Sequence, residues 1–231
     1  MPLCFKDESG NLTNMNRLFK YFSIFGILLV FAAYFFRLFE VNGFVRYISQ
    51  QEEPTVYLKT IGIIYKIDYF FIALIMVSCL VSFILMNKDK KMPLFSASII
   101  PIVVAIIERL YFVISSSVVA KKTMESNISI VNIINIVILA IGLLSIINSI
   151  LVERFLDNKQ LSFLFSMFSI ASITASTLIS VYASIINKAS IHFILYAIFF
   201  LLAVILIAIE LILRTHQNKK EDASDAPSIE A

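Results

Sequence analysis

The stretch IDYFFIALIMVSCLVSFILM, residues 67–86, contains twenty residues and a single charged side chain, Asp68. A helix rises about 1.5 Å per residue, so about twenty apolar residues cross the hydrocarbon core of a bilayer. A strand of a membrane β-barrel would instead alternate in polarity over about ten residues. The stretch therefore predicts a transmembrane helix.

Five more windows of this kind follow from the same criterion. The six predicted spans are 18–39, 67–86, 94–116, 128–151, 161–186 and 190–213. The composition agrees, because 59% of the residues are hydrophobic and the mean hydropathy is +0.90. Charged residues make up 15% of the chain, against about 25% in soluble domains. We predict an all-α membrane protein, a bundle of six transmembrane helices.

The distribution of lysine and arginine predicts the orientation of the bundle. Cytoplasmic loops carry an excess of these residues, and six spans place both chain ends on one side. That side holds eleven basic residues, the other side holds seven, and Arg109 lies within a span. The eleven are Lys6, Arg17, Lys20, Lys88, Lys90, Lys91, Arg154, Lys159, Arg214, Lys219 and Lys220. We therefore predict cytoplasmic termini and a multi-pass location in a cell membrane, of the bacterial plasma membrane type.

The remaining segments are short and polar. Residues 1–16 form a polar cytoplasmic segment, and 17–214 form the six-helix transmembrane domain with an outer loop at 40–60. Residues 215–231 are small, acidic and proline-containing, so we expect a disordered cytoplasmic tail. The net charge of +3 comes from residues that flank the spans, so it does not indicate a nucleic-acid partner. The partner that the composition does predict is the lipid bilayer.

One pair of charges, Glu108 and Arg109, lies deep inside a predicted span, in AIIERLYFV at 105–113. If that span covers 94–116, the pair lies beyond its centre, in the outer leaflet. Neighbouring residues of a helix point about 100° apart, so the two side chains cannot readily neutralise each other. Each is expected to have a partner on another helix. Pro101 in the same span predicts a kink.

Several other polar residues are expected at the same depth. The set that we predict as an outer-leaflet polar layer consists of Glu108, Arg109, Asp68, Arg37, Asn132, Asn135 and His192. Glu108 is expected to pair with Arg37 or His192, and Arg109 with Asp68. The expected rim consists of Tyr34, Tyr69, Tyr111, Tyr182 and Tyr196. Ionisable groups inside a membrane indicate a functional site, here a ligand-binding layer; the alternative is a structural network of ion pairs.

Serines recur along the fifth span, several of them four residues apart. They are Ser162, Ser166, Ser169, Ser172, Ser176, Ser180 and Ser184. Residues four apart share a helix face, and small side chains let helices approach closely in lipid. We predict a packing seam; the alternatives are the lining of a solute path and a contact with a partner membrane protein.

The sequence lacks the motifs HExxH and GxSxG and any glycine-rich phosphate loop. Its two histidines, His192 and His216, are expected on opposite sides of the membrane. We therefore predict no catalytic residues, no metal and no cofactor, and an enzyme is disfavoured. The function that we predict is a ligand-binding or transport-related role centred on the polar layer, with a small solute arriving from outside. The alternative is a membrane scaffold or sensor subunit whose intramembrane charges are structural.

Overall fold

The computed structural model describes residues 13–88, 98–124, 129–156, 158–186 and 190–224. These residues form helices only, in the order α1 Thr13–Ser49, α2 Val56–Lys88, α3 Ile99–Met124, α4 Ile130–Leu156, α5 Lys159–Ile186 and α6 Ile191–Ser224. Each of the six is long and apolar enough to span a membrane. The predicted all-α, six-helix architecture of a multi-pass membrane protein is confirmed at this level.

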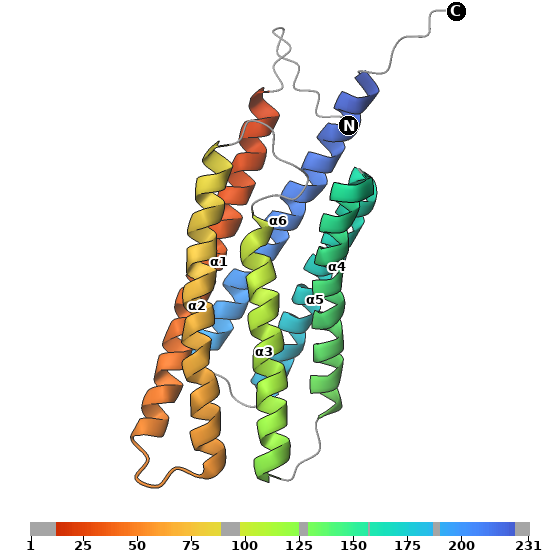
Figure 1. Cartoon of the computed structure of the whole chain (residues 1–231). Helices are drawn as coiled ribbons and strands as arrows, with labels where there is room; N and C mark the ends of the chain where they lie inside the picture. The colour runs from red at the N-terminus through yellow and green to blue at the C-terminus, as the bar shows by residue number, and fades with distance from the viewer. Residues whose placement is uncertain (1–12, 89–97, 125–128, 157, 187–189, 225–231) are drawn as a thin grey trace, which may run out of the picture.

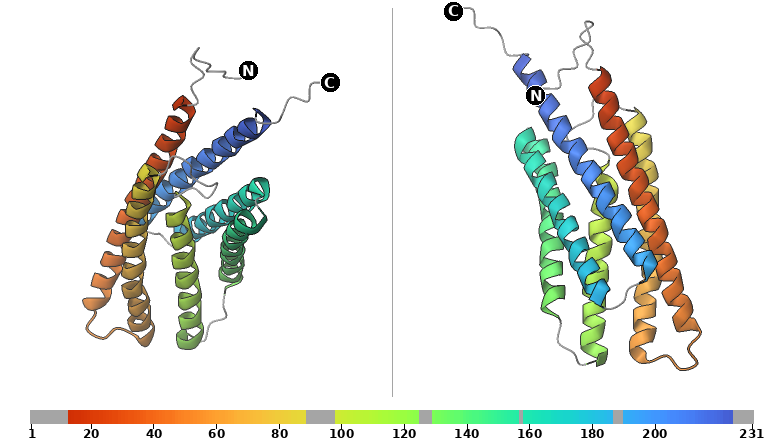
Figure 2. Two further views of the ribbon diagram at one scale, coloured as in Figure 1. Left: turned by 45° about the horizontal axis from the view of Figure 1, so that its top comes forward. Right: turned by 180° about the vertical axis from the view of Figure 1, so that it is seen from behind.

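The helices run up and down, so that α1 begins and α6 ends at the same end of the bundle (Figure 1). We call this the near end, and the opposite end, where α1 connects to α2, the far end. Seen from behind, α6 lies along α1, while α4 and α5 form an antiparallel pair beside them (Figure 2). The prediction that the near end faces the cytoplasm remains a prediction.

Two helices extend beyond the predicted spans. The segment predicted as an outer loop at 40–60 is mostly helical, because α1 continues to Ser49 and α2 begins at Val56. Residues 40–49 contain no proline, so α1 can continue to Ser49 before the short connection that contains Pro54. The hydroxyl of Thr55 then accepts a hydrogen bond from the Leu58 amide at 3.3 Å, which caps the start of α2.

The predicted disordered tail is likewise helical over much of its length, because α6 continues to Ser224. Lysine, glutamine, glutamate and alanine between 217 and 223 are good helix formers, and they let the helix extend past the apolar span. At the other end, α1 begins at Thr13, inside the predicted polar segment. Residues 1–12 and 225–231 lie outside the described residues.

Pro101, for which the sequence predicts a kink, lies where proline breaks no hydrogen bond of its helix. It is the third residue of α3, which begins at Ile99. An amide hydrogen in the first turn of a helix has no intrahelical acceptor, so proline removes no hydrogen bond there. The predicted start of this span at residue 94 lies outside the described residues.

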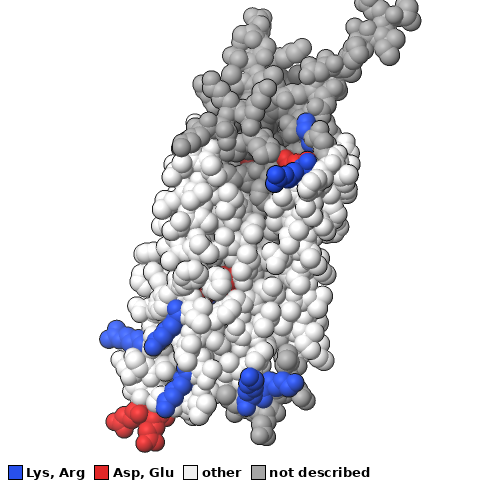
Figure 3. All heavy atoms as spheres, in the orientation of Figure 1, with Lys and Arg blue, Asp and Glu red and all other residues white. Residues whose placement is uncertain are grey.

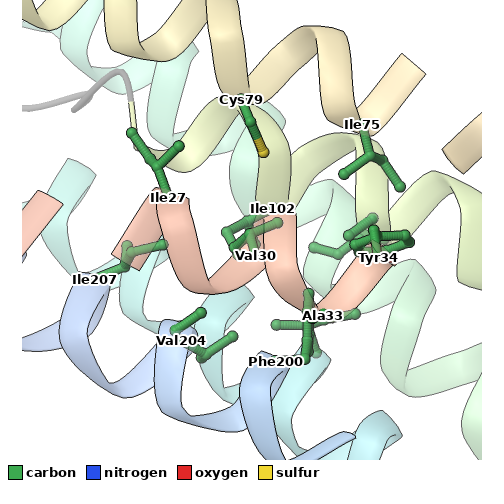
Figure 4. Packing of buried hydrophobic residues seen from close by; sticks show 14 of the residues in the cluster. Ile27, Val30, Ala33, Tyr34, Ile75, Cys79, Ile102, Phe200, Val204 and Ile207 are labelled. Carbon is green, nitrogen blue, oxygen red and sulfur yellow. The ribbon is translucent and has the colours of Figure 1, made fainter. Parts of the chain in front are cut away.

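The hydrophobic core centres on α1, which lies between α2 and α6 (Figure 4). Its labelled members are Ile27, Val30, Ala33 and Tyr34 of α1, Ile75 and Cys79 of α2, Ile102 of α3, and Phe200, Val204 and Ile207 of α6. The helices α1 and α6 approach closely at Gly26, where an added Cβ would lie 2.8 Å from Ile207 Cγ1. Small residues at crossings give this kind of contact in lipid.

The surface matches a protein embedded in a bilayer. On the face shown in Figure 3, the described Lys, Arg, Asp and Glu side chains gather toward the two ends, and very little of the middle belongs to these residue types. Large side chains such as Phe70, Leu80, Leu144 and Phe168 are more than half exposed there or on the other faces. Exposed apolar area of this extent is expected where lipid is the solvent.

Candidate functional site

Arg37 of α1 is the centre of a buried ion-pair network. Its Nη1 donates a hydrogen bond to Glu40 Oε2 at 2.7 Å, and its Nη2 donates one to Asp68 Oδ2 at 2.8 Å. Glu108 Oε1 lies 4.0 Å from the same Nη2. Three carboxylates from three helices thus surround one guanidinium, so the network ties α1, α2 and α3 together.

The helices position these groups by simple spacing. Arg37 and Glu40 are three residues apart on α1 and therefore share a face. Tyr34, one turn before Arg37, donates its hydroxyl hydrogen to Glu108 Oε2 at 3.2 Å. The pairing of Glu108 with Arg37, one of the two predicted for it, is present at the longer distance of 4.0 Å.

Arg109 faces a different neighbourhood from Glu108. Its Nε and Nη2 donate to the Tyr196 hydroxyl of α6 at 3.2 and 2.9 Å, and its Nη1 donates to Ser180 Oγ of α5 at 3.2 Å. Its guanidinium carbon also lies 5.0 Å from the centre of the Tyr196 ring. Among the described residues no carboxylate comes within 4.0 Å of this guanidinium.

The predicted pairing of Arg109 with Asp68 is therefore wrong. Asp68 is bonded to Arg37 instead. The reason is the 100° between adjacent residues of a helix: when Glu108 points toward α1 and α2, Arg109 points toward α5 and α6. The second candidate partner of Glu108, His192, is exposed and stacks on Phe39, with ring centres 5.7 Å apart.

The charged pair also lies nearer the middle of its helix than the sequence predicts. Helix α3 runs from 99 to 124, so its midpoint falls at (99 + 124)/2, or between 111 and 112. Glu108 and Arg109 therefore stand about one turn on the near side of the midpoint rather than beyond it on the far side. The sequence placed the span at 94–116, whereas α3 continues to Met124; the leaflet in which the pair lies stays a prediction.

A pocket of about 720 Å³ opens beside Arg109 in the far half of the bundle. All six helices, or the residues that begin them, contribute to its wall. The polar lining residues are Arg37, Glu40, Tyr65, Arg109, Ser116, Asn132, Asn135, Ser180, Ser190 and His192. Gly43, Val131 and His192 are exposed members of the wall, so the pocket reaches the surface.

The predicted site residues thus divide into two groups. Arg37, Arg109, Asn132, Asn135 and His192 line the pocket, as predicted for a common site. Asp68 and Glu108 do not line it, because they are buried behind Arg37. Ligand binding by any of the seven remains a prediction.

The two asparagines of α4 differ in their partners. Asn132 Nδ2 donates to Ser117 Oγ of α3 at 3.0 Å, which joins α4 to α3 beside the pocket. Asn135 is 4% exposed, and its buried Oδ1 has no hydrogen-bond partner among the described residues. An uncompensated amide in an apolar interior is unfavourable, so Asn135 is a polar group that lacks its partner.

The predicted tyrosine rim is only partly correct. Tyr34 and Tyr196 are buried within the polar cluster, where they bond Glu108 and Arg109. The other three lie elsewhere: Tyr69 bonds Asn42 at 3.3 Å, Tyr111 packs on Phe71, and Tyr182 is 68% exposed. Depth alone predicted the rim, and depth does not say which side of a helix a residue occupies.

Sequence reasoning missed several members of the pocket wall, among them Phe112 and Ser116 of α3. Their spacing from Arg109 is three and seven residues, so all three occupy one face of the helix. That spacing was visible in the sequence. Tyr65 of α2, also missed, lies under Arg37, whose guanidinium carbon is 5.8 Å from the Tyr65 ring centre.

The serine side of α5 packs against α4 of the same chain. Ser149 Oγ of α4 lies 2.8 Å from both Ser162 Oγ and Ser166 Oγ. Further along, an added Cβ at Gly142 would lie 2.8 Å from Ser172 Cβ, so the two backbones nearly touch. These contacts match the predicted packing seam. A partner protein on α5 remains a prediction, and it would need a different side of the helix.

A metal centre finds no support in this cluster: within the ranges that the structure describes, no group of three or more His, Cys, Asp or Glu side chains could hold a metal ion. The three carboxylates around Arg37 surround its guanidinium, which occupies the place that a cation would need. Comparisons of the chain with protein-family models, with curated proteins and with solved structures gave no match.

Proposed function

We propose that this chain is an integral membrane protein that binds a small solute in the pocket beside Arg109, in a ligand-binding or transport-related role. The observation that carries the proposal is the incomplete state of two groups on the pocket wall. Among the residues that the structure describes, Arg109 has only neutral hydrogen-bond partners, and the buried amide oxygen of Asn135 has none. Buried polar groups usually have partners, and a solute in the pocket would supply them for both groups. Within the described part of the chain, unpartnered buried oxygens also occur away from the pocket wall, on Asp68 and Ser169, so it is the combination with the Arg109 guanidinium that carries the proposal.

The size of the pocket supports the same proposal. Sites for small molecules are typically about 300 to 1,000 Å³, and the volume beside Arg109 falls within that range. Polar groups from α1, α3, α4, α5 and the start of α6 converge on it. Binding sites between the helices of a bundle are commonly built in this way.

The second candidate, a scaffold or sensor subunit with structural charges, is favoured by the other half of the cluster. Arg37, Asp68 and Glu108 are buried and connected to one another. We propose that this network supports the bundle and that the pocket half carries the binding. If the protein is only a scaffold, we expect that no water enters the pocket.

We further propose that the far end faces the outside of the cell, because the eleven basic residues assigned to the near side outnumber the seven on the other. Both proposals can be tested with single cysteines. In a background with Cys4→Ser and Cys79→Ala, Ser116→Cys places a thiol on the pocket wall. Ile114→Cys, on the same helix at nearly the same depth, places one on the exposed apolar surface.

A charged, membrane-impermeant thiol reagent reacts only where water reaches the thiol. We expect the Ser116→Cys variant to react in intact cells and the Ile114→Cys variant to stay unreactive even after the membranes are opened. If both variants stay unreactive in opened membranes, the pocket is sealed and the scaffold proposal takes over. Reaction at residue 116 only after opening would reverse the proposed orientation and leave the binding proposal standing.

A further inference from the structure

We infer that the solute is an organic anion, a small carboxylate with an apolar body, whose carboxylate contacts Arg109 and Asn135. This inference rests on the proposed function and adds the chemical class of the ligand. It is carried by the geometry of the Arg109 guanidinium, by the unpartnered amide, by the charge of the pocket wall and by its aromatic residues.

The guanidinium of Arg109 keeps free donors. It has five N–H groups, and three hydrogen bonds join it to the hydroxyls of Tyr196 and Ser180. Both acceptors are uncharged, so the positive charge has no counterion at contact distance within the described ranges of the chain. A planar guanidinium binds a carboxylate through two parallel N–H donors, which hydroxyl groups cannot reproduce.

Asn135 supplies a second, independent indication. Its side chain lines the pocket and is almost completely buried, and its Oδ1 accepts no hydrogen bond from the described residues. A side-chain amide offers two N–H donors as well as its oxygen. A carboxylate between Arg109 and Asn135 would accept from the guanidinium and from Nδ2 of the amide, while Oδ1 of the amide, itself an acceptor, would take a donor from elsewhere on the ligand or from water.

The charge of the wall favours an anion over a cation. The ionised lining residues are Arg37, Arg109 and Glu40, which sum to +1 with neutral histidine. Glu40 is already bonded to Arg37 at 2.7 Å, and Asp68 and Glu108 are not on the wall. A cation that entered would therefore meet no free carboxylate, and an anion would meet Arg109 directly.

Aromatic rings form much of the apolar part of the wall, beside aliphatic residues such as Val113 and Ile179. The rings belong to Phe39, Phe44, Tyr65, Phe112 and Phe193. Flat apolar side chains of this kind bury the apolar body of a ligand and leave its charged end to the polar groups. The arrangement therefore favours amphiphilic anions over small inorganic ones.

Three probes of equal size separate the classes of ligand: benzoate, benzamide and benzylammonium. The full chain, purified in an uncharged detergent, is titrated with each, and its midpoint of thermal unfolding is followed, because a ligand of the folded state raises that midpoint. We expect benzoate to bind about tenfold more tightly than benzamide, as one charge-assisted contact provides, and benzylammonium to have no effect. If benzamide or benzylammonium binds as tightly as benzoate or more tightly, the ligand is not an anion, but the proposal that the pocket binds a solute still holds.

Asn135→Asp is the informative variant, because it changes no side-chain volume and adds a negative charge to the wall. We expect it to lose the benzoate effect. Ser169→Ala is the matched control: Ser169 Oγ is another buried atom without a hydrogen-bond partner among the described residues, and it is not on the pocket wall. The Ser169→Ala variant should respond to benzoate as the parent does. Unchanged benzoate binding by the Asn135→Asp variant overturns the assignment of the carboxylate to this position.

A lipid headgroup could bring an anion to the same place, so the titration is repeated with added phosphatidylglycerol. Stabilisation by this lipid together with no response to benzoate overturns the inference of a free organic anion. No response to any probe also overturns it, and the cysteine experiment then shows whether the proposed binding function fails as well. An unreactive thiol at residue 116 means that it does; a reactive one means that only the class of ligand was wrong.

Discussion

Replacement of Arg37 by methionine should destabilise the bundle more than any other single change in the polar cluster. The side chain is 7% exposed and holds Glu40 and Asp68 at 2.7 and 2.8 Å, with Glu108 at 4.0 Å. Methionine keeps much of the apolar length of arginine, so the change removes mainly the charge and its hydrogen bonds. The three carboxylates then face one another.

The magnitude follows from the charges. With Arg37 present, three carboxylates and the guanidiniums of Arg37 and Arg109 give a formal charge of −3 + 2 = −1; without it the sum is −3 + 1 = −2. Removal of one partner from a buried ion pair costs about 3 to 5 kcal/mol, and Arg37 has two partners at hydrogen-bonding distance. We expect a loss of at least that size, which is a large part of the about 5 to 15 kcal/mol of a typical folded protein.

Asp68→Asn gives the internal comparison. The amide oxygen can still accept from Arg37 at the same place, and the formal charge of the cluster becomes −2 + 2 = 0. The cost should therefore be smaller, about 1 to 3 kcal/mol for one weakened buried hydrogen bond. A larger loss in the free energy of unfolding for Arg37→Met than for Asp68→Asn would show that the guanidinium contributes more to stability than this carboxylate.

The assay is unfolding by sodium dodecyl sulfate in mixed micelles, followed by circular dichroism. Arg46→Met is the matched control, because Arg46 lies on the same helix with an exposed side chain. It should change the free energy of unfolding by less than about 0.5 kcal/mol. If the Arg37→Met variant unfolds at the same detergent fraction as the Arg46→Met variant, the network does not hold α1, α2 and α3 together and the reasoning fails.

Two further predictions concern packing and a buried hydroxyl. Gly142→Ala should lower the free energy of unfolding by about 1 to 3 kcal/mol, because the new Cβ would lie 2.8 Å from Ser172 Cβ. Gly43→Ala is the control, and it should be neutral or slightly stabilising because no atom lies within 4 Å of its new Cβ. Equal effects of the two variants in the same unfolding assay would contradict the close α4–α5 contact. Tyr34→Phe should cost about 1 to 3 kcal/mol by removing the donor to Glu108, and unfolding identical to the parent would show that this hydrogen bond contributes nothing.

The helices were predictable because lipid imposes one strong requirement: every backbone hydrogen bond must be satisfied inside the membrane. Hydropathy therefore found all six spans. It could not find where the helices end, because outside the hydrocarbon both water and further helical turns satisfy the backbone. The extensions of α1 to Ser49 and α6 to Ser224 lie in that region.

The site was predictable as a set of residues and less so as a set of contacts. Five of the seven candidates, which were chosen by their depth along the spans, line one pocket. The choice of partner depends on the rotation of each helix about its axis, which in lipid is set by packing between helices rather than by the sequence of one helix. That is why Asp68 was assigned to Arg109 and binds Arg37 instead.

The adjacency of Glu108 and Arg109 explains how one turn of α3 can serve two purposes. Glu108 faces α1 and α2, and Arg109 faces α6 and the junction with α5. That junction is closed near the pocket by single hydrogen bonds, such as Asn132 to Ser117 and Arg109 to Ser180. Single hydrogen bonds of this kind between membrane helices are worth about 0.6 kcal/mol. A ligand that binds the free N–H groups of Arg109 would therefore bind beside a weakly held junction, and we expect movement of the α4–α5 pair, rather than of the core, to accompany binding.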